Sequence, residues 1–291
     1  MFQSRFIDHE DIDMNTKQIL LLAITALACL LVMAGCTDNS GTGPDVVTMP
    51  TVSFAETPVQ YENVNGVTLG YREFGSGEPL LMVMGFGGTI DGWDETFIGI
   101  LASKYHVYTY DHRGMGYSSD NNATPSIPQY ANDAAELMTA LGYDSMHVYG
   151  VSMGSVISQQ LVIEQPDRVQ KLVLSSSSYS VRIPETQKLL GQVEDTAVDP
   201  TVPEGERKEA EAILTFDGTY DGLAGIDKDV MLIAGTGDDL TPDSVSVQMA
   251  GQINGSWLLR FKGIPHAGSM YAPVEYGESV VVFLGMDESP V

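Results

Sequence analysis

HVYGVSMGSVISQQLVIEQ, residues 147–165, joins an apolar run typical of a buried strand to a stretch with helical periodicity. The junction is GVSMG, 150–154, a G-x-S-x-G pattern. A sharp strand-to-helix turn strains the backbone of its central residue, so the flanking positions must be small, and Gly150 and Gly154 meet that requirement. We therefore expect Ser152 to project its hydroxyl from one edge of a sheet and to be a candidate nucleophile.

A histidine is the candidate base for this serine, because a free hydroxyl is a weak nucleophile and needs a base within hydrogen-bond reach. His106 and His147 begin predicted strands, at the end of the sheet away from the serine. His112 follows a predicted strand end at a position typical of a structural role. His266, in KGIPHAGS after the last predicted strand, is placed to face Ser152.

A carboxylate is expected to orient the histidine. The sequence GTGDD, 235–239, follows the predicted strand VMLIA, 230–234. An aspartate there can accept the proton of the second ring nitrogen and stabilise the imidazolium. Asp238 has the spacing of a G-x-x-D pattern and is preferred, with its neighbour Asp239 as the alternative.

Short apolar runs alternate with helical stretches from residue 60 onward. YENVNGVTLGYREFG, 61–75, predicts a β-hairpin because it alternates and contains an Asn-Gly turn. This alternation predicts an α/β fold with a mostly parallel sheet, helices on both faces and ligands beyond the carboxyl ends of the strands. Further strands are predicted at 79–85, 106–112, 146–152, 171–177, 230–236 and 256–263, and helices near 93–104, 126–141, 153–164, 242–252 and 273–285.

Residues 179–222 interrupt the alternation. They are polar, acidic and partly helical, and they separate two predicted strands. We expect a short insertion that lies over the strand ends as a lid. A long but ordinary crossover connection is the alternative.

Residues 1–35 are interpreted as a secretory signal. The uncharged apolar run 19–34 is short for a membrane-spanning helix, which needs ~20 residues, but suits a signal. VMAGC, 32–36, resembles a bacterial or archaeal lipobox, which implies a lipid on Cys36. Acidic residues precede Met14, so translation is expected to start there. An uncleaved anchor helix is the alternative, and both readings place the domain on the outer side of a membrane.

Composition limits the partners. The chain carries 14 Lys and Arg against 39 Asp and Glu, a net charge of −25, so its surface repels phosphate backbones and nucleic-acid binding is not expected. Removal of a signal that contains Cys29 would leave Cys36 alone, without a disulfide or a cysteine-based metal site. The segment 36–58 is rich in Thr, Ser, Gly and Pro and predicts a flexible tether to a domain at 59–291.

From about residue 60 to the C-terminus the sequence resembles the α/β-hydrolase superfamily. Several motifs match in the family's order, which makes the resemblance specific. It implies the α/β-hydrolase fold, with the serine as nucleophile, the histidine as general base and the aspartate as orienting group. No metal or organic cofactor is expected. The motifs besides GVSMG are MGFGGTIDGW (84–93), DHRGMGYS (111–118), AGTGDDLTP (234–242) and GIPHAG (263–268).

The resemblance also implies an oxyanion hole formed by the backbone N–H groups of Phe86 and Met153. The segment 111–118 matches a turn that is a scaffold in the family, so Arg113 is expected to be structural. One departure concerns Met84, which stands where the family usually has a histidine. This change removes a side chain that shapes the oxyanion loop but leaves the backbone donors.

We expect a serine hydrolase that cleaves small-molecule carboxylic esters with small or medium acyl chains through an acyl-enzyme. The residues expected near the pocket are apolar, and no Arg or Lys cluster is available for a charged acid: Phe86, Met115, Met153 and Met270. Alternatives on the same three residues are perhydrolase or haloperoxidase-like, lactonase or acyltransferase activity. The alternative from another class is a surface lipoprotein that binds without turnover.

Overall fold

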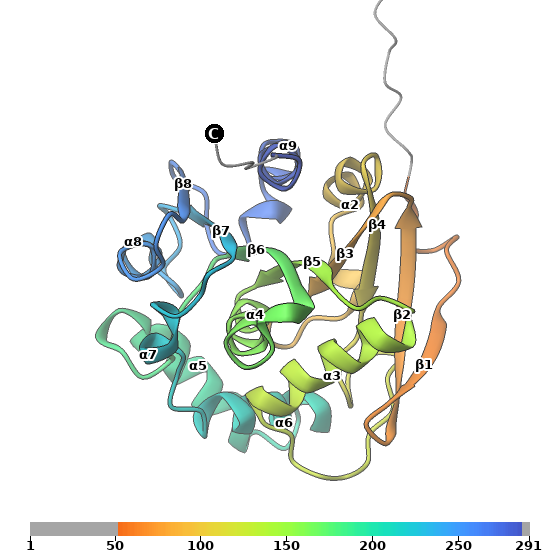
Figure 1. Cartoon of the computed structure of the whole chain (residues 1–291). Helices are drawn as coiled ribbons and strands as arrows, with labels where there is room; N and C mark the ends of the chain where they lie inside the picture. Colours follow the sequence, from red (N-terminus) through yellow and green to blue (C-terminus); the bar gives the residue numbers. More distant parts are fainter. Residues whose placement is uncertain (1–51, 287–291) are drawn as a thin grey trace, which may run out of the picture. The chain divides into compact units, whose positions relative to one another are not determined.

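An eight-stranded sheet forms the centre of the chain in the computed structural model, which describes residues 52–286 (Figure 1). The strand order is β1-β2-β4-β3-β5-β6-β7-β8. The β1–β2 and β2–β4 pairs are antiparallel and all other neighbours are parallel, as the alternating pattern predicts. The strands are β1 (Gln60–Val64), β2 (Val67–Gly75), β3 (Glu78–Val83), β4 (Tyr105–Tyr110), β5 (Met146–Val151), β6 (Val169–Ser175), β7 (Asp229–Gly235) and β8 (Trp257–Phe261).

Helices cover both faces of the sheet, and each face has its own apolar core. Side chains of α3, α4 and α8 belong to one buried cluster, and those of α2 and α9 belong to the other. Figure 1 shows α2 and α9 on the side of the sheet opposite α3 and α4. The bounds are α2 (Glu95–Ala102), α3 (Ile127–Ala140), α4 (Met153–Glu164), α8 (Asp243–Ala250) and α9 (Pro273–Leu284).

Local sequence signals explain the first hairpin and helix α3. Asn65 and Gly66 both have positive φ, 45° and 79°, as a two-residue hairpin turn requires. The Ser126 side chain caps α3 by accepting a hydrogen bond from the backbone N–H of Gln129 at 3.2 Å. Gly142 follows the helix with φ 88° and ends it. Both predicted elements are confirmed.

The central parallel strands are buried on both faces, as their continuous apolar runs indicate. All six residues of β5 are buried, and β3, β6 and β7 are buried along most of their length. Because β3, β5, β6, β7 and β8 are parallel neighbours, the loops that follow them meet at one edge of the sheet.

The N-terminal boundary of the domain differs from the prediction. Val52 and Phe54 are buried, and the Phe54 ring packs edge-on against Phe74 with centroids 5.1 Å apart. The Phe54 N–H donates to Glu95 Oε1 at 2.8 Å. Residues 52–58, which the composition assigns to the tether, therefore pack against β2 and α2, because the polar stretch contains two apolar side chains that find a buried place.

The predicted signal at 1–35, the start at Met14 and the lipid site at Cys36 lie outside the described residues. The rest of the predicted tether, up to residue 51, lies outside them as well. Within 52–286, no helix combines the length and the apolar character that crossing a bilayer requires.

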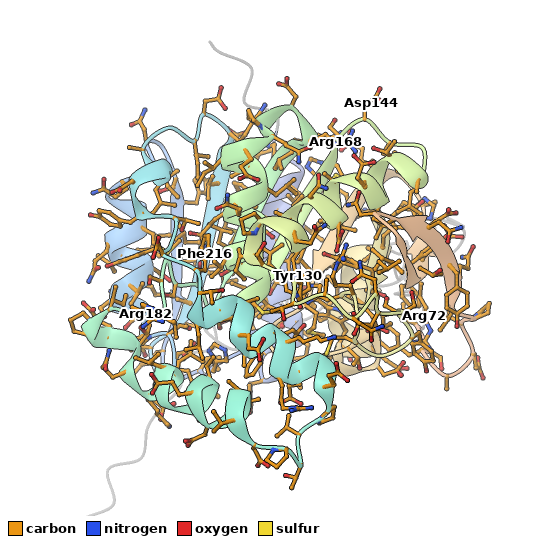
Figure 2. The ribbon with its side chains drawn as sticks, turned by 90° about the horizontal axis from the view of Figure 1, so that it is seen from below. Arg72, Tyr130, Asp144, Arg168, Arg182 and Phe216 are labelled. Atoms are coloured by element: carbon orange, nitrogen blue, oxygen red, sulfur yellow. The ribbon has the colours of Figure 1, made fainter. Side chains whose placement is uncertain are left out.

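The insertion, residues 179–222, lies in the connection from β6 to β7. It contains α5 (Gln187–Val198), α6 (Glu204–Leu214) and α7 (Tyr220–Leu223). Helices α5 and α6 pack mainly against each other and not on a face of the sheet (Figures 1 and 2). Arg182, labelled in Figure 2, donates to the carbonyl of Leu214 and ties the two ends of this helical pair together. The segment therefore has the geometry of an insertion, not of a crossover helix.

Candidate active site

Ser152 lies at the sharp turn between β5 and α4, with φ 54° and ψ −120°. A positive φ is strained for a residue with a side chain and persists only where the surroundings enforce it. A Cβ at Gly150 would lie 2.4 Å from the carbonyl oxygen of Gly154. A Cβ at Gly154 would lie 2.1 Å from the carbonyl oxygen of Val83. Glycine at both positions thus lets β3, β5 and α4 approach closely enough to hold the turn.

The side chains of Ser152, His266 and Asp238 form one line of hydrogen bonds. His266 Nε2 lies 2.9 Å from Ser152 Oγ, and His266 Nδ1 lies 2.8 Å from Asp238 Oδ2. The Asp238 side chain is fully buried, while that of His266 is 20 % exposed. The loops after β5, β7 and β8 thus bring together three residues that are far apart in the sequence.

Asp238, and not Asp239, contacts the histidine. Asp238 Oδ1 accepts hydrogen bonds from the backbone N–H groups of Leu240 and Thr241, both at 2.9 Å. The Asp239 side chain is 69 % exposed and pairs with Lys188 of α5. Burial by itself raises the pKa of Asp238, but the hydrogen bond and charge of His266, together with the two backbone donors, outweigh it and lower the pKa. Asp238 is therefore held as a carboxylate beside the imidazole.

Thr241 and Ser176 support this line of hydrogen bonds, and neither residue is predicted from the sequence. Thr241 Oγ1 lies 2.9 Å from Asp238 Oδ2, 2.9 Å from the Ser176 carbonyl oxygen and 3.2 Å from His266 Nδ1. The Ala267 N–H donates to Ser176 Oγ at 3.0 Å, and both residues have positive φ, 55° and 46°. The signal that could have identified them is their place in the loops directly after β7 and β6.

The loop after β3 brings Phe86 beside the serine. The Gly88 N–H donates to the Gly85 carbonyl at 3.1 Å and closes a tight turn. A Cβ at Gly85 would lie 3.1 Å from Ser152 Cβ, so this backbone lies directly against the serine. Met84, in place of the family's usual histidine, is buried and packs beneath the loop, with Sδ 2.9 Å from where a Cβ of Gly88 would be. The turn is therefore supported by an apolar contact at this position.

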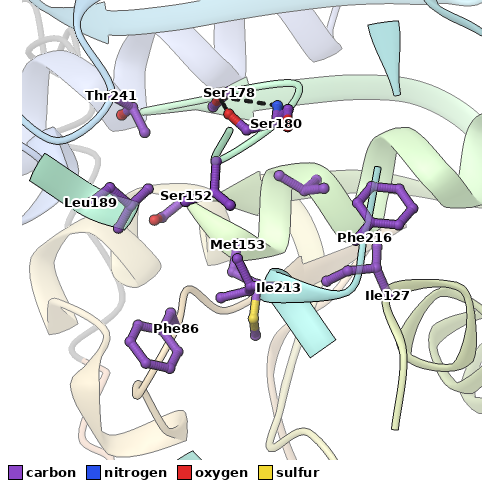
Figure 3. A pocket seen from close by; sticks show the side chains of 12 residues that line it. Phe86, Ile127, Ser152, Met153, Ser178, Ser180, Leu189, Ile213, Phe216 and Thr241 are labelled. Carbon is purple, nitrogen blue, oxygen red and sulfur yellow. Dashed lines mark hydrogen bonds between the residues drawn. The ribbon is translucent and has the colours of Figure 1, made fainter. Parts of the chain in front are cut away.

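A pocket lies beside Ser152, and the space between its walls, including open solvent at its mouth, is about 480 Å³. Figure 3 shows Ser152 between Thr241 on one side and Phe86 and Met153 on the other. Most of the lining is apolar, and the insertion contributes part of it. The lining residues are Phe86, Ile127, Ser152, Met153, Val156, Ser178, Ser180, Val181, Leu189, Ile213, Phe216 and Thr241.

Comparisons with known proteins agree with this architecture. A family model described as alpha/beta hydrolase fold matches residues 78–217. The structure of a thermophilic esterase from Thermogutta terrifontis is similar, with a TM-score of 0.70 at 19 % identity over 78 % of this chain and 98 % of that chain. The chain belongs to the α/β-hydrolase superfamily.

Curated relatives of this hydrolase have several different names. A protein of Azorhizobium caulinodans named "Putative carbamate hydrolase RutD" is 26 % identical over 260 residues, which are 77 % of this chain and 98 % of that protein. A protein of Synechocystis named "Putative non-heme chloroperoxidase" is 33 % identical over 117 residues, 40 % of this chain. That match spans 42 % of the relative, so the chain aligns with less than half of its length.

Two residues that were expected near the pocket of the hydrolase do not line it. Met115 is buried, but it packs under α6, with Sδ 3.0 Å from where a Cβ of Gly205 would be. Met270 is 56 % exposed and lies beyond the loop that carries His266. Met115 lies within the motif 111–118 and Met270 follows the motif 263–268, and only the packing of α6 and of the loop after His266 decides which way these side chains face.

The 111–118 turn is a scaffold in this hydrolase, as the resemblance implied. Arg113 Nε and Nη2 donate to the two carboxylate oxygens of Asp133 at 2.5 Å and 2.6 Å, in a buried pair away from Ser152. Asp111 accepts hydrogen bonds from the backbone N–H groups of Ile90 and Tyr117 at 2.6 Å and 2.7 Å. The turn is thereby joined to the segment that follows the Phe86 loop.

The other histidines among residues 52–286 lie outside this line of hydrogen bonds. His106 Nε2 is 2.9 Å from Glu73 Oε2 and His147 Nε2 is 3.4 Å from Glu78 Oε2, near the amino ends of their strands, as expected. In the part of the chain that the structure describes, no group of three or more His, Cys, Asp or Glu side chains could hold a metal ion.

Proposed function

We propose that this hydrolase cleaves carboxylic esters with small or medium acyl chains, with Ser152 as nucleophile, His266 as general base and Asp238 as orienting group. The observation that carries the proposal is the unbroken line of hydrogen bonds from Ser152 Oγ through the imidazole to the Asp238 carboxylate. This line ends at the wall of an apolar pocket, where an acyl chain can bind beside the hydroxyl.

The reaction follows from the geometry. Ser152 Oγ attacks the ester carbonyl carbon while its proton passes to His266 Nε2. The bond to the alkoxy group then breaks, and His266 returns the proton to the departing alcohol. Water attacks the acyl-enzyme with His266 again as base, which releases the acid and restores Ser152. Asp238 holds the Nδ1–H tautomer throughout and stabilises the imidazolium.

The backbone N–H groups of Phe86 and Met153 are the proposed donors to the oxyanion. Met153 is the first residue of α4, where N–H groups lack intrahelical partners and the helix dipole favours negative charge. Phe86 belongs to the turn whose Gly85 lies against Ser152. A donor of this kind contributes about 3 kcal/mol to the transition state.

The pocket supports a neutral acyl chain. Its lining contains no Arg or Lys among the described residues, and its polar groups are the hydroxyls of Ser152, Ser178, Ser180 and Thr241. The Ser178 hydroxyl donates to the Ser180 carbonyl at 2.7 Å, and is therefore already engaged within the protein. The acidic surface, with a net charge of −25, further disfavours anionic substrates.

A series of p-nitrophenyl esters tests the proposal. We expect kcat/KM to be highest for butyrate or octanoate and at least about tenfold lower for palmitate, because a bounded apolar pocket gains from each methylene only until it is filled. The measurement is the initial rate of p-nitrophenol release across acetate, butyrate, octanoate and palmitate. Inactivity on every member would contradict ester hydrolysis.

Perhydrolysis is a second candidate, favoured by the relative named as a chloroperoxidase. Hydrogen peroxide would then attack the acyl-enzyme in place of water and release a peracid, which oxidises halide. A second assay, with acetate, hydrogen peroxide, bromide and a reporter dye, separates the two functions, because only perhydrolysis leads to bromination of the dye. The relative named as a carbamate hydrolase makes carbamates a further substrate to include.

We also propose that the hydrolase is held on the outer side of a membrane by a lipid on Cys36. The support is the VMAGC sequence after an apolar run. We expect the wild type, but not Cys36→Ser, to incorporate a labelled fatty acid, because only the wild type has the thiol that is lipidated. A wild type without label would contradict lipidation at this residue.

A further inference from the structure

A buried carboxylate of the insertion reaches the loop that carries Phe86. Glu209 of α6 has a side chain that is 0 % exposed. Its Oε2 accepts a hydrogen bond from the backbone N–H of Gly87 at 2.8 Å, and its Oε1 lies 2.9 Å from His112 Nδ1. One side chain thus joins the insertion, the Phe86 loop and the loop after β4.

The chemistry of this contact requires two donors. A buried carboxylate without hydrogen-bond partners lowers the stability of the folded state by several kcal/mol, whereas one that accepts hydrogen bonds is tolerated. A glutamate carboxylate can only accept, so this contact needs the His112 tautomer that carries its proton on Nδ1. His112 Nε2 has no partner within the described residues, so this ring makes its hydrogen bond to Glu209 alone.

Helix α6 contacts the body of the domain directly at two places. A Cβ at Gly205 would lie 2.1 Å from the carbonyl oxygen of Gly114, so the start of the helix touches the scaffold turn backbone to backbone. Lys208 pairs with Asp120 at 2.5 Å, in the segment that follows the same turn. The insertion, which the sequence predicts to be a lid, therefore has one helix that is anchored to the domain and can hold a fixed acceptor.

The Glu209 carboxylate accepts its hydrogen bond from the central peptide of the turn at residues 85–88. Residues 85–88 form a four-residue turn that is closed by the Gly88 N–H bond, and Gly87 at its third position has φ 71°, which suits a type II turn. The N–H that Glu209 accepts belongs to the central peptide, between Phe86 and Gly87. Without this acceptor the peptide can rotate and the turn can relax, which would displace the neighbouring Phe86 N–H.

We propose that Glu209 is a positioning residue for the oxyanion hole, which holds the Phe86 N–H in place by binding the central peptide of its turn. The inference rests on the proposed role of Phe86 as oxyanion donor. An oxyanion donor acts on the transition state, so its displacement lowers kcat and kcat/KM together while KM stays nearly constant.

Two substitutions separate hydrogen bonding from charge and from shape. Glu209→Gln can accept from the Gly87 N–H with its carbonyl and donate to His112 with its amide, if the ring moves its proton to Nε2. We expect its kcat to stay within about threefold of the wild type. Glu209→Asp keeps the charge but is one methylene shorter, so it cannot reach the Gly87 N–H. We expect its kcat to fall by about 100-fold at unchanged KM.

The matched controls are Glu211→Gln and Glu211→Asp, on an exposed position of the same helix. We expect wild-type kcat for both, with p-nitrophenyl butyrate as substrate. A folded Glu209→Asp with wild-type kcat would overturn the proposal, because it would show that catalysis does not depend on the hydrogen bond to Gly87. A Glu209→Gln as slow as Glu209→Asp would also overturn it, because it would show that catalysis depends on the charge of Glu209 and not on the hydrogen bond.

Amide exchange tests the same contact without relying on turnover. We expect the Gly87 amide to exchange at least about tenfold faster in Glu209→Asp than in the wild type and in Glu209→Gln, since its acceptor is lost. Unchanged protection of Gly87 would overturn the proposal even where folding is intact. If the wild type hydrolyses no ester, the proposed function fails, while this measurement still decides whether Glu209 holds the turn.

Discussion

Ser152→Ala is expected to lower kcat for p-nitrophenyl butyrate by about 10⁶-fold, because it removes the attacking oxygen and leaves only binding and backbone polarisation. The fold should persist, since the Ser152 side chain donates only to His266, at the pocket wall. Ser279→Ala, on α9 away from the pocket, is the matched control and should retain wild-type rates.

Labelling by a fluorophosphonate probe gives an independent measurement of this prediction. The wild type and Ser279→Ala should be labelled, and Ser152→Ala should not, because the probe reacts with an activated serine hydroxyl. Labelling of Ser152→Ala would show that another residue is the nucleophile. A folded wild type that the probe does not label would instead favour a surface lipoprotein that binds without turnover.

Asp238→Asn is expected to lower kcat by about 10⁴-fold, because an amide in this position favours the wrong imidazole tautomer and cannot stabilise the imidazolium. The neighbouring Asp239→Asn is the matched control. It removes an exposed ion pair with Lys188, so we expect a change of less than about twofold.

Rates with p-nitrophenyl butyrate at neutral pH check this prediction for both variants. Circular dichroism should show that each variant remains folded. In Asp238→Asn the amide oxygen can still accept hydrogen bonds from the N–H groups of Leu240 and Thr241. Comparable losses in Asp238→Asn and Asp239→Asn would contradict the assignment of the orienting carboxylate.

Much of the fold follows from local signals. Short continuous apolar runs identify the central parallel strands, and the Asn65-Gly66 turn identifies the hairpin. The G-x-S-x-G spacing around Ser152 predicts a sharp elbow because its two glycines lie two residues on either side of the serine. Periods and turns are properties of short segments, so no knowledge of distant contacts is needed to detect them.

The boundary of the domain shows where local composition misleads. Residues 52–58 end a segment, 36–58, whose content of Thr, Ser, Gly and Pro predicts a tether, but the Phe54 ring is buried against Phe74. Met115 and Met270 show the same limit, because their motif positions say nothing about the side of the loop on which each side chain lies. These outcomes depend on which surfaces come together after folding.

Sequence order alone was enough to nominate Ser152, His266 and one of two adjacent aspartates, because the carboxyl ends of parallel strands meet at one edge. Tertiary packing decides that Asp238 and not Asp239 contacts the histidine, because it buries Asp238 beside two N–H donors while Asp239 faces solvent. Tertiary packing also places the carboxylate of Glu209 against the N–H of Gly87, which is 122 residues away in the sequence. Pairings of this kind depend on how whole elements lie against one another, and no short segment encodes them.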